Sequence, residues 1–491
     1  MRKKIGFKFA SASFSTVDGS DFAPKLRLLL QGYESEMRRL GLVDIYVLEQ
    51  FMLYCSYVSR NIVELGVIDF DDRFSIDEVE TYIGNEYVAA GFVDYYAELR
   101  AYGCVLPNLR GIEFRERDLS SAITMWARML ASSGLSLMEK GEGKTASTIW
   151  SLLAETHGSE SWGRRGGKHA ASLSIANLAT SLADVEGKTV LDLACGNGVY
   201  LATALSKGAA SACGRDIDAS AVMRAKIACF FADPTKSSDI ANGDVLKATS
   251  ATAPAERVFV APPLGTRLRM SEVSDGGFAR EMVAHATGEE APRAVSAEDF
   301  CVLKALDSLT EDGVAILHVS TGFLFQQQRT RQALRRMLVQ DRHLQTVIEL
   351  PGGCVPGSGV KSALLVLTAR PNRGGVLIVD CDSKEFDGKG FVSKGRGRCE
   401  ITEAGIDWLV KAVEQRKEIP LVATIVEREE ILANGSSLCY SAYGDVVDYA
   451  AALDEVRSVD EILGDMRDAQ LEVDALRGRI EGILELFKEK E

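Results

Sequence analysis

From residue 186 onward, short runs of apolar residues alternate with longer segments that have helical periodicity. The apolar runs lie at residues 188–193, 210–214, 257–260, 312–318, 344–349, 362–368 and 375–380. Runs of this length are typical of buried strands, and their alternation with helices predicts an α/β fold with a parallel or mostly parallel sheet. In such sheets a ligand binds at the carboxyl ends of the strands. Candidate chemistry should therefore lie where these runs end.

Different patterns flank this region. Residues 21–155 have mostly helical periodicity and predict a separate helical domain. Near the other end, a capping box at residues 458–461 precedes a helix with a narrow apolar seam. The seam residues recur at alternating spacings of four and three: Ile462, Met466, Ala469, Val473, Leu476, Ile480, Ile483 and Phe487. This seam predicts a coiled-coil-like helix that packs on a partner helix, from this chain or another. Packing on the chain's own domain is the alternative, because Gly478 and Gly482 weaken the helix.

The length of 491 residues exceeds one typical hydrophobic core, so several domains are expected. We divide the chain into a helical N-terminal domain (1–155), an α/β domain (156–385), a distal loop-rich region (386–455) and the heptad helix (456–491). The net charge of −14 argues against a protein that holds nucleic acid by its global field. Local basic patches or a basic partner subunit remain compatible with it.

The ten cysteines are scattered, with no C-x-x-C motif and no histidines at ligand spacing. This pattern predicts reduced thiols in a cytoplasmic protein and no metal site. The basic N-terminus has no apolar segment behind it, and no apolar run reaches 18 residues. We therefore expect neither a secreted nor a membrane-spanning protein.

The first apolar run leads into a turn that contains one carboxylate and two closely spaced glycines: Asp192, Gly196 and Gly198. Glycine lets the backbone turn sharply and approach a ligand without a Cβ in the way. A dinucleotide-binding turn has a third glycine for close helix packing, and Leu201 stands in that place. S-adenosylmethionine has no pyrophosphate, so this turn fits it better than NAD. For the glycines alone, an ordinary strand–turn–helix junction is an equal alternative.

Two more acids follow at the ends of likely strands. Asp216 lies twenty residues after Gly196, where a ribose diol needs a carboxylate acceptor. Asp244 follows a helix-like segment and is placed to meet the edge of an adenine ring. Each acid alone is more typical of a solvated loop, but the ordered set of three predicts a nucleoside cofactor.

A second motif follows the run at 257–260. Its residues are Ala261, Pro262, Pro263, Leu264 and Gly265. Two consecutive prolines cannot continue a strand ladder, so they predict a rigid loop beside the cofactor. In position and context the motif resembles the N-P-P-F-G loop of class I methyltransferases that modify exocyclic amino groups.

The resemblance extends to a particular family, the modification subunit of type I restriction-modification systems. The matching segments begin at Glu298-Asp-Phe-Cys, Leu309-Thr-Glu-Asp-Gly, Gly322-Phe-Leu-Phe, Val347-Ile-Glu-Leu-Pro-Gly-Gly, Gly357-Ser-Gly-Val-Lys and Glu427-Arg-Glu-Glu. The match covers roughly residues 160–491 and is strong in order and spacing. It implies a Rossmann-like, seven-stranded methyltransferase sheet over residues 156–385. It also implies methylation of the exocyclic amino group of adenine in DNA, with a separate specificity subunit and a possible restriction subunit.

The resemblance also assigns roles to residues. The turn, with Asp192, Ala194, Gly196 and Gly198, would line the methionine and ribose end of S-adenosylmethionine. Asp216 would hold the ribose hydroxyls and Asp244 the adenine amine. His169 stands at the start of the segment where the family has Phe-Tyr-Thr-Pro near the cofactor. The implied catalytic loop comprises Ala261, Pro262, Pro263 and Leu264.

The catalytic loop departs from the family at two positions. Ala261 replaces an asparagine that accepts a hydrogen bond from the target amine, and Leu264 replaces an aromatic residue that stacks on the flipped base. Loss of one preorganised polar group typically costs about 10²–10³ in rate. Two alternatives to an active DNA methyltransferase follow. One is a binding or scaffold subunit that has kept the fold without the chemistry, and the other is a class I methyltransferase with a non-DNA substrate.

Overall fold

The computed structural model describes residues 28–33, 35–37, 39, 125, 129, 172–233, 235–245, 253–263, 265–269, 284, 294–355, 359–383, 386, 390–393 and 399–444. The chain divides into two units, Met1–Tyr443 and Gly444–Glu491, and the elements below belong to the first. The heptad helix over 456–491, His169 and Leu264 lie outside the described residues. So does most of the helical domain over 1–155, whose described residues are helical. These assignments stay predictions.

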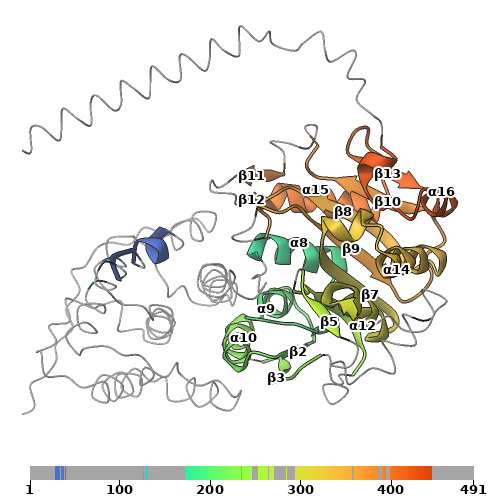
Figure 1. Cartoon of the computed structure of the whole chain (residues 1–491). Helices are drawn as coiled ribbons and strands as arrows, with labels where there is room; N and C mark the ends of the chain where they lie inside the picture. Colours follow the sequence, from blue (N-terminus) through green and yellow to red (C-terminus); the bar gives the residue numbers. More distant parts are fainter. Residues whose placement is uncertain are drawn as a thin grey trace, which may run out of the picture. The chain divides into compact units, whose positions relative to one another are not determined.

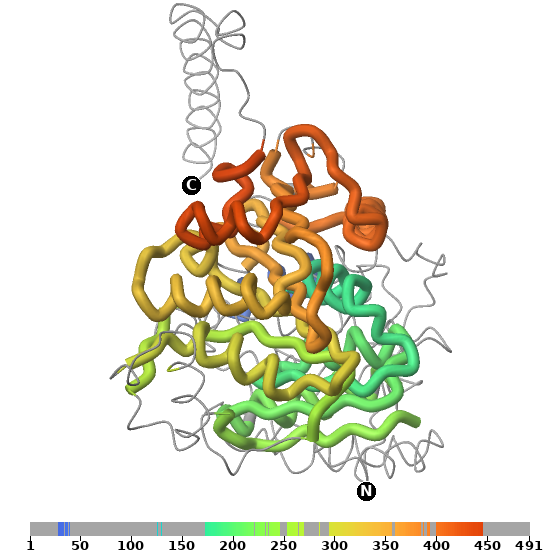
Figure 2. The backbone as a smooth tube through the Cα atoms, turned by 90° about the vertical axis from the view of Figure 1, so that its right-hand side faces the viewer, coloured from blue at the N-terminus to red at the C-terminus, as the bar shows by residue number. Residues whose placement is uncertain are grey.

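A nine-stranded mixed sheet organises the described part of the first unit, in the order β13-β10-β8-β9-β7-β4-β1-β2-β3. Its strands are β1 (Thr189–Asp192), β2 (Ser211–Asp216), β3 (Ser237–Asn242), β4 (Ala255–Val260), β7 (Leu309–Ser320), β8 (Leu344–Leu350), β9 (Ser362–Thr368), β10 (Val376–Asp380) and β13 (Ala423–Val426). In Figure 2 the green segments lie at one end of the coloured part and the orange to red segments at the other, in agreement with this order. The predicted α/β fold is confirmed.

The sheet differs from the implied seven strands, which is a correction. Seven strands run from β8 to β3, and β9 is antiparallel to both β7 and β8. Beyond them, β10 pairs in parallel with β8, and β13 closes that edge in the antiparallel sense. The apolar runs predicted β10 but not β3 or β13. β3 is a polar, largely exposed edge strand, and β13 has only four residues, so neither forms a distinctive run.

Helices cover both faces of the sheet, as the alternating pattern predicts (Figure 1). One face packs against α8 (Leu173–Ala183), α9 (Val199–Ser206), α10 (Ala219–Ala232) and α15 (Glu403–Glu414). The other packs against α12 (Ala297–Asp307), α13 (Thr321–Phe325), α14 (Arg329–Gln340) and α16 (Arg428–Ala433). Successive strand residues point to opposite faces, so Ile316 of β7 enters one core and Leu317 the other.

Small elements complete the described unit. They are the antiparallel pairs β5 (Arg267–Arg269) with β6 (Ala294–Ser296) and β11 (Phe391–Ser393) with β12 (Cys399–Ile401), and the 3₁₀ helix η4 (Tyr440–Ala442). Among the described residues, no helix has the length and apolar character needed to cross a membrane. Within the same residues, no group of His, Cys, Asp or Glu side chains is arranged to hold a metal ion.

A buried ion network joins α12, the end of β7 and α14. Arg331 donates through Nη2 to Glu298 Oε2 at 2.8 Å and through Nε to Asp299 Oδ1 at 2.9 Å, and all three side chains are at most 7% exposed. Glu298 also accepts the backbone N–H and the hydroxyl of Ser320, where β7 ends. Each buried charge thus has a partner, and the start of α14 is tied to the carboxyl end of β7.

Replacing Arg331 with alanine should leave two buried carboxylates without their cation. Because unpaired buried charges are costly, we expect R331A to lose about 3–5 kcal/mol of unfolding free energy, measured by denaturant titration. The matched control is R370A, because Arg370 pairs with exposed Glu311 and Asp312 and should cost less than about 1 kcal/mol. Equal losses in the two variants would contradict this assignment.

Candidate functional site

The turn between β1 and α9 is built on two glycines in the left-handed conformation. Gly196 has φ +50° and Gly198 has φ +78°, a region that other residues enter at a cost. The turn is tied to the end of β2 by a hydrogen bond of 2.9 Å from the Cys195 N–H to the Arg215 carbonyl. A sharp turn at the carboxyl end of β1 therefore exists where the glycines predicted it.

The two glycines serve different purposes. A Cβ at Gly198 would lie 2.7 Å from the Cβ and 2.8 Å from the Cα of Ala225, so this glycine allows α10 to pack closely on the turn. A Cβ at Gly196 would meet nothing within 4 Å. Open space beside the turn is therefore found at Gly196, and we place the approach of a ligand there.

Asp216 reaches across from the end of β2 and holds this turn. Its Oδ2 accepts the Gly196 N–H at 2.8 Å, and its Oδ1 accepts the Asp218 N–H at 2.8 Å. The twenty-residue spacing thus brings Asp216 and the glycine turn together. A carboxylate has about four acceptor positions, so both oxygens keep capacity for further donors such as hydroxyls.

Asp192, the last residue of β1, is 1% exposed and accepts the Ala194 N–H at 3.1 Å. Burial raises its pKa to about 7, the Ala194 hydrogen bond opposes the rise, and the charge of Asp216 adds to it. A buried carboxylate of this kind is stabilised by any cation or donor that binds beside it.

Tyr200 is a neighbouring residue to which sequence reasoning assigned no role. Its ring stacks on Phe259 with centroids 5.4 Å apart, and within the described structure its buried hydroxyl has no hydrogen-bond partner. Burial and then the nearby charge of Asp192 raise the pKa of Tyr200. The available sequence signal is a phenol hydroxyl at the start of a largely apolar helix. A buried donor without a partner is costly, so this hydroxyl is suited to a ligand.

The end of β3 completes this edge of the site. Asn242 donates to the carbonyls of Asp216 and Ile217 at 3.0 and 2.9 Å, and the Gly243 N–H donates to the Asp216 carbonyl. Asp244 therefore follows directly after residues that touch the Asp216 turn. Ile217 is apolar, yet its side chain is 68% exposed. Ile217 was not among the predicted site residues, although its position directly after Asp216 could have indicated one.

The loop after β4 lies at the same carboxyl edge. β4 pairs in parallel with β1, with Phe259 opposite Asp192, so Ala261, Pro262 and Pro263 emerge beside the turn. Pro262 is buried, and its two neighbours are half-buried. The predicted site residues that the structure describes thus lie at the ends of four adjacent strands, β4, β1, β2 and β3, at one edge of the sheet.

Comparison with known proteins adds the family. A model of the family described as N-6 DNA Methylase matches residues 152–450, more than half of the chain. The chain belongs to the N-6 DNA methylase family. This membership implies S-adenosylmethionine as the methyl donor. No curated protein gives a significant match.

Solved structures support the fold of this N-6 DNA methylase. The methyltransferase subunit of a type I restriction-modification system from Streptococcus thermophilus is 18% identical, with a TM-score of 0.63 over 86% of this chain and all of that one. A chain of a type I restriction-modification assembly is 15% identical, with a TM-score of 0.55 over 94% of this chain and 98% of that one. At these identities the likeness establishes a shared fold.

The two glycines give separable predictions. G196A should fold with a loss of about 1–2 kcal/mol from its left-handed backbone, yet bind S-adenosylmethionine more weakly, because its Cβ enters the open space. G198A should lose more stability than G196A, because its Cβ collides with α10. The measurements are denaturant titration and calorimetric titration with the cofactor.

The control for these variants is G187A. Gly187 has φ +68° and no atom within 4 Å of a built Cβ, but it precedes β1 at the opposite end of the strand. G187A should lose about 1–2 kcal/mol of unfolding free energy, because alanine is strained in the left-handed conformation, but its affinity for the cofactor should not change. The assignment is wrong if G198A is as stable as G196A, or if G187A weakens the cofactor as much as G196A does.

Asp192 predicts a pH dependence of stability. Its pKa in the folded protein is raised to about 7 from about 3.8, so the folded state binds the extra proton. Stability from this group is fully present below about pH 4 and is lost as the pH rises to about 7. D192N keeps an acceptor for the Ala194 N–H but has no group that titrates. The unfolding free energy of D192N relative to that of the wild type should therefore rise from pH 5 to 7 and become constant above pH 8.

Denaturant titration over pH 5–9 tests this, with D312N as the control. Asp312 is exposed and should give a curve parallel to the wild type. Other titrating groups, such as the buried Glu349, are present in all three proteins and cancel in the differences. Parallel curves for D192N and wild type would exclude the raised pKa.

Proposed function

We propose that this chain is the modification subunit of a type I-like restriction-modification system. In this proposal it transfers a methyl group from S-adenosylmethionine to the exocyclic amino group of adenine in DNA. A separate specificity subunit selects the site, since the chain is acidic overall. A restriction subunit is a further possible partner, and the heptad helix over 456–491 is the segment we assign to packing on a partner helix.

The observation that carries the proposal is the arrangement of Asp192, Gly196 and Asp216 at the carboxyl ends of β1 and β2. The buried Asp192 carboxylate, the unpartnered Tyr200 hydroxyl and the open space at Gly196 lie along the same turn. These groups fit a ligand that has a positive charge and hydrogen-bonding groups, which describes the methionine end of the cofactor. The family match independently implies the same cofactor.

Each residue then has a role in binding. Asp192 and Ala194 line the methionine end, and Gly196 leaves room for the ribose. Asp216 accepts from the ribose hydroxyls through the acceptor capacity left by its two backbone hydrogen bonds. Asp244 accepts from the adenine amine, and the exposed Ile217 side chain offers an apolar surface to a flat ring. His169, which lies outside the described residues, is assigned to the cofactor site by the family resemblance alone.

The loop after β4 holds the target amine. When bound, S-adenosylmethionine supplies an electrophilic methyl group. The target nitrogen is conjugated with its ring and is a weak nucleophile, so acceptors for its two protons favour attack. The Pro262 carbonyl provides one acceptor, and the Ala261 side chain provides none. Leu264 is aliphatic, whereas the aromatic residue that the family has at this position would stack on the base, and stacking is worth roughly 1–3 kcal/mol.

Ala261 therefore favours one alternative in particular, a scaffold subunit that binds cofactor or DNA without methyl transfer. A methyltransferase with a small-molecule or protein substrate is the other alternative, because such a substrate does not need the asparagine or the aromatic residue.

The proposal is tested with the full chain, its genomic specificity subunit, radiolabelled S-adenosylmethionine and host DNA. We expect methyl transfer to DNA, with cofactor binding followed by calorimetry in parallel. Cofactor binding without transfer supports the scaffold. Transfer to lysate protein or small molecules but not to DNA supports the third reading, and absence of cofactor binding overturns the cofactor site.

A double substitution tests the loop. A261N with L264F restores the side-chain acceptor and the aromatic ring, and we expect about 10²-fold faster methylation of DNA by the complex. Cofactor affinity should not change, since neither residue belongs to the glycine turn. The single variant L264F serves as the control, because it adds stacking without the acceptor. An unchanged rate with intact cofactor binding contradicts a latent adenine site.

A further inference from the structure

We propose that the turn between α13 and α14, residues 325–329, is a DNA-contacting surface on which Phe325 stacks against a base. It would supply the aromatic face that the loop after β4 lacks. This inference rests on the proposed function, because it assigns a DNA contact to the same edge of the sheet. Position, exposure, anchoring and charge each support it.

The turn lies beside the loop after β4. β7 is the next strand to β4 and runs parallel to it, with Leu317 opposite Val260. β7 ends at Ser320, and α13 begins at the next residue. The short helix therefore extends from the carboxyl edge at which Ala261–Pro263 emerge, so a base held at that loop is within the neighbourhood of this turn.

Phe325 is exposed in a helix that otherwise buries its apolar residues. Phe323 and Leu324 are 0% exposed, whereas Phe325 is 51% exposed. Leaving such a side chain in water forgoes part of the roughly 1.5–3 kcal/mol that full burial provides. Phe325 is the one phenylalanine among the exposed large apolar residues of the described structure. Ile217 and Val360, also exposed, flank other strand ends at this edge.

The backbone around Phe325 is firmly anchored, so its exposure is not the result of a loose end. Nη1 of Arg335, a fully buried residue, donates to the carbonyls of Phe323 and Gln326 at 2.8 and 3.0 Å. The Leu324 carbonyl accepts the Leu438 N–H at 2.9 Å from a segment more than a hundred residues away. A fixed backbone with an outward aromatic side chain is preorganised and loses little entropy on binding.

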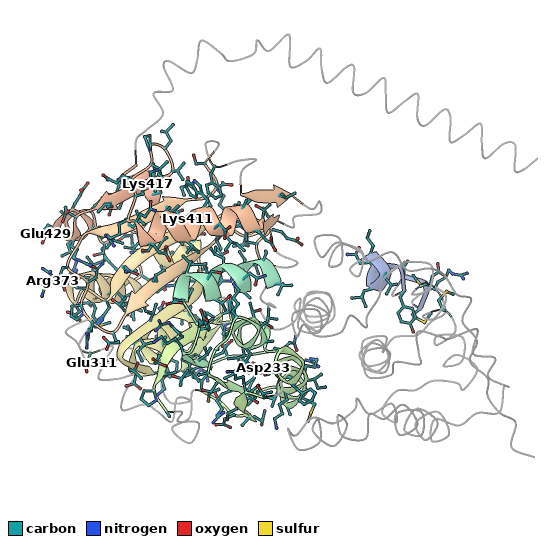
Figure 3. All side chains as sticks on the ribbon, turned by 180° about the vertical axis from the view of Figure 1, so that it is seen from behind. Asp233, Glu311, Arg373, Lys411, Lys417 and Glu429 are labelled. Carbon is teal, nitrogen blue, oxygen red and sulfur yellow. The ribbon has the colours of Figure 1, made fainter. Side chains whose placement is uncertain are left out.

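The charge pattern favours DNA over an acidic or apolar partner. Charged side chains of both signs project from the described unit, including Asp233, Glu311, Arg373 and Lys411 (Figure 3). By contrast, residues 313–340 contain no acid and four arginines, in a chain of net charge −14. Arg331 and Arg335 are buried, and Arg329 and Arg336 are exposed. The α13–α14 turn lies within this acid-free stretch.

The exposed side chains of the turn have the chemistry of nucleic-acid contacts. Gln327, Gln328 and Arg329 are all exposed. Carboxamides donate to and accept from base edges, arginine binds phosphate, and an aromatic ring stacks on bases of any sequence. An aromatic residue with these three groups two to four positions after it fits a strand of DNA whose base has left the duplex stack.

The test uses the full chain and a 20-nucleotide single-stranded oligodeoxyadenylate that contains 2-aminopurine, followed by anisotropy and by the fluorescence of 2-aminopurine, which falls on stacking. We expect F325A to bind about 5- to 150-fold more weakly, with less quenching. F325Y should bind like the wild type. F325L should behave like F325A, because an aliphatic side chain fills space without stacking.

Two matched controls accompany these variants. V392A truncates an exposed apolar residue of β11 and should leave binding unchanged. R329A should reduce the slope of log affinity against log salt by about 0.7, whereas R370A, at the amino-terminal end of the β7–β9 region, should not. Thermal midpoints within the wild-type range establish that F325A is folded.

Three outcomes overturn the inference: no binding of the probe by the wild type, wild-type affinity and quenching in F325A, or wild-type quenching in F325L. If F325A keeps DNA affinity but no longer assembles with the specificity subunit, the surface is a protein contact. Calorimetry with S-adenosylmethionine on the same preparations separates this result from the proposed function. If S-adenosylmethionine binds and F325A binds DNA like the wild type, only the proposed DNA-contacting surface is wrong. If S-adenosylmethionine does not bind, only the proposed cofactor site is wrong.

Discussion

The hydrogen bond from the Gly196 N–H to the Asp216 carboxylate is the interaction on which the site depends. It joins the turn after β1 to the end of β2, and so keeps Gly196 in a left-handed conformation with open space beside it. Because the turn is fixed, Asp192 stays buried beneath it and its pKa stays raised by the loss of water. The Asp216 carboxylate therefore fixes a turn that, together with buried Asp192, favours a cationic, hydrogen-bonding ligand.

A second set of buried polar groups organises the other side of the carboxyl edge. Arg331 pairs with two buried carboxylates, whereas Arg335 donates through Nε to the Ser436 carbonyl and through Nη1 to the Phe323 carbonyl of α13. These arginines stand one turn apart on α14 and face inward, so they hold the ends of β7 and α13 in place. The exposed residues of the α13–α14 turn then owe their positions to side chains that are themselves hidden from solvent.

Much of the sheet was predictable because parallel strands buried on both faces are written as continuous apolar runs. Seven of the nine strands follow from such runs, including β10. β3 and β13 do not, since an exposed edge strand and a four-residue strand need few apolar residues. The direction of β9 was equally hidden, because an apolar run has the same composition in either orientation. For the site, the spacing of residues located Asp216 and the glycines. It could not identify Tyr200, which stands out only because its buried hydroxyl has no hydrogen-bond partner among the described residues.

By itself the sequence determined the α/β class, the glycine turn, the acids at successive strand ends and the unusual Ala-Pro-Pro-Leu loop, because each depends on local residue type and order. Tertiary structure alone decided that Gly198 serves helix packing while Gly196 faces open space. It also decided that Asp216 supports the turn and that Phe325 is exposed in the helix that follows β7, the strand beside β4. Those properties depend on which atoms lie nearby from distant parts of the chain, and the order of residues does not state such distances.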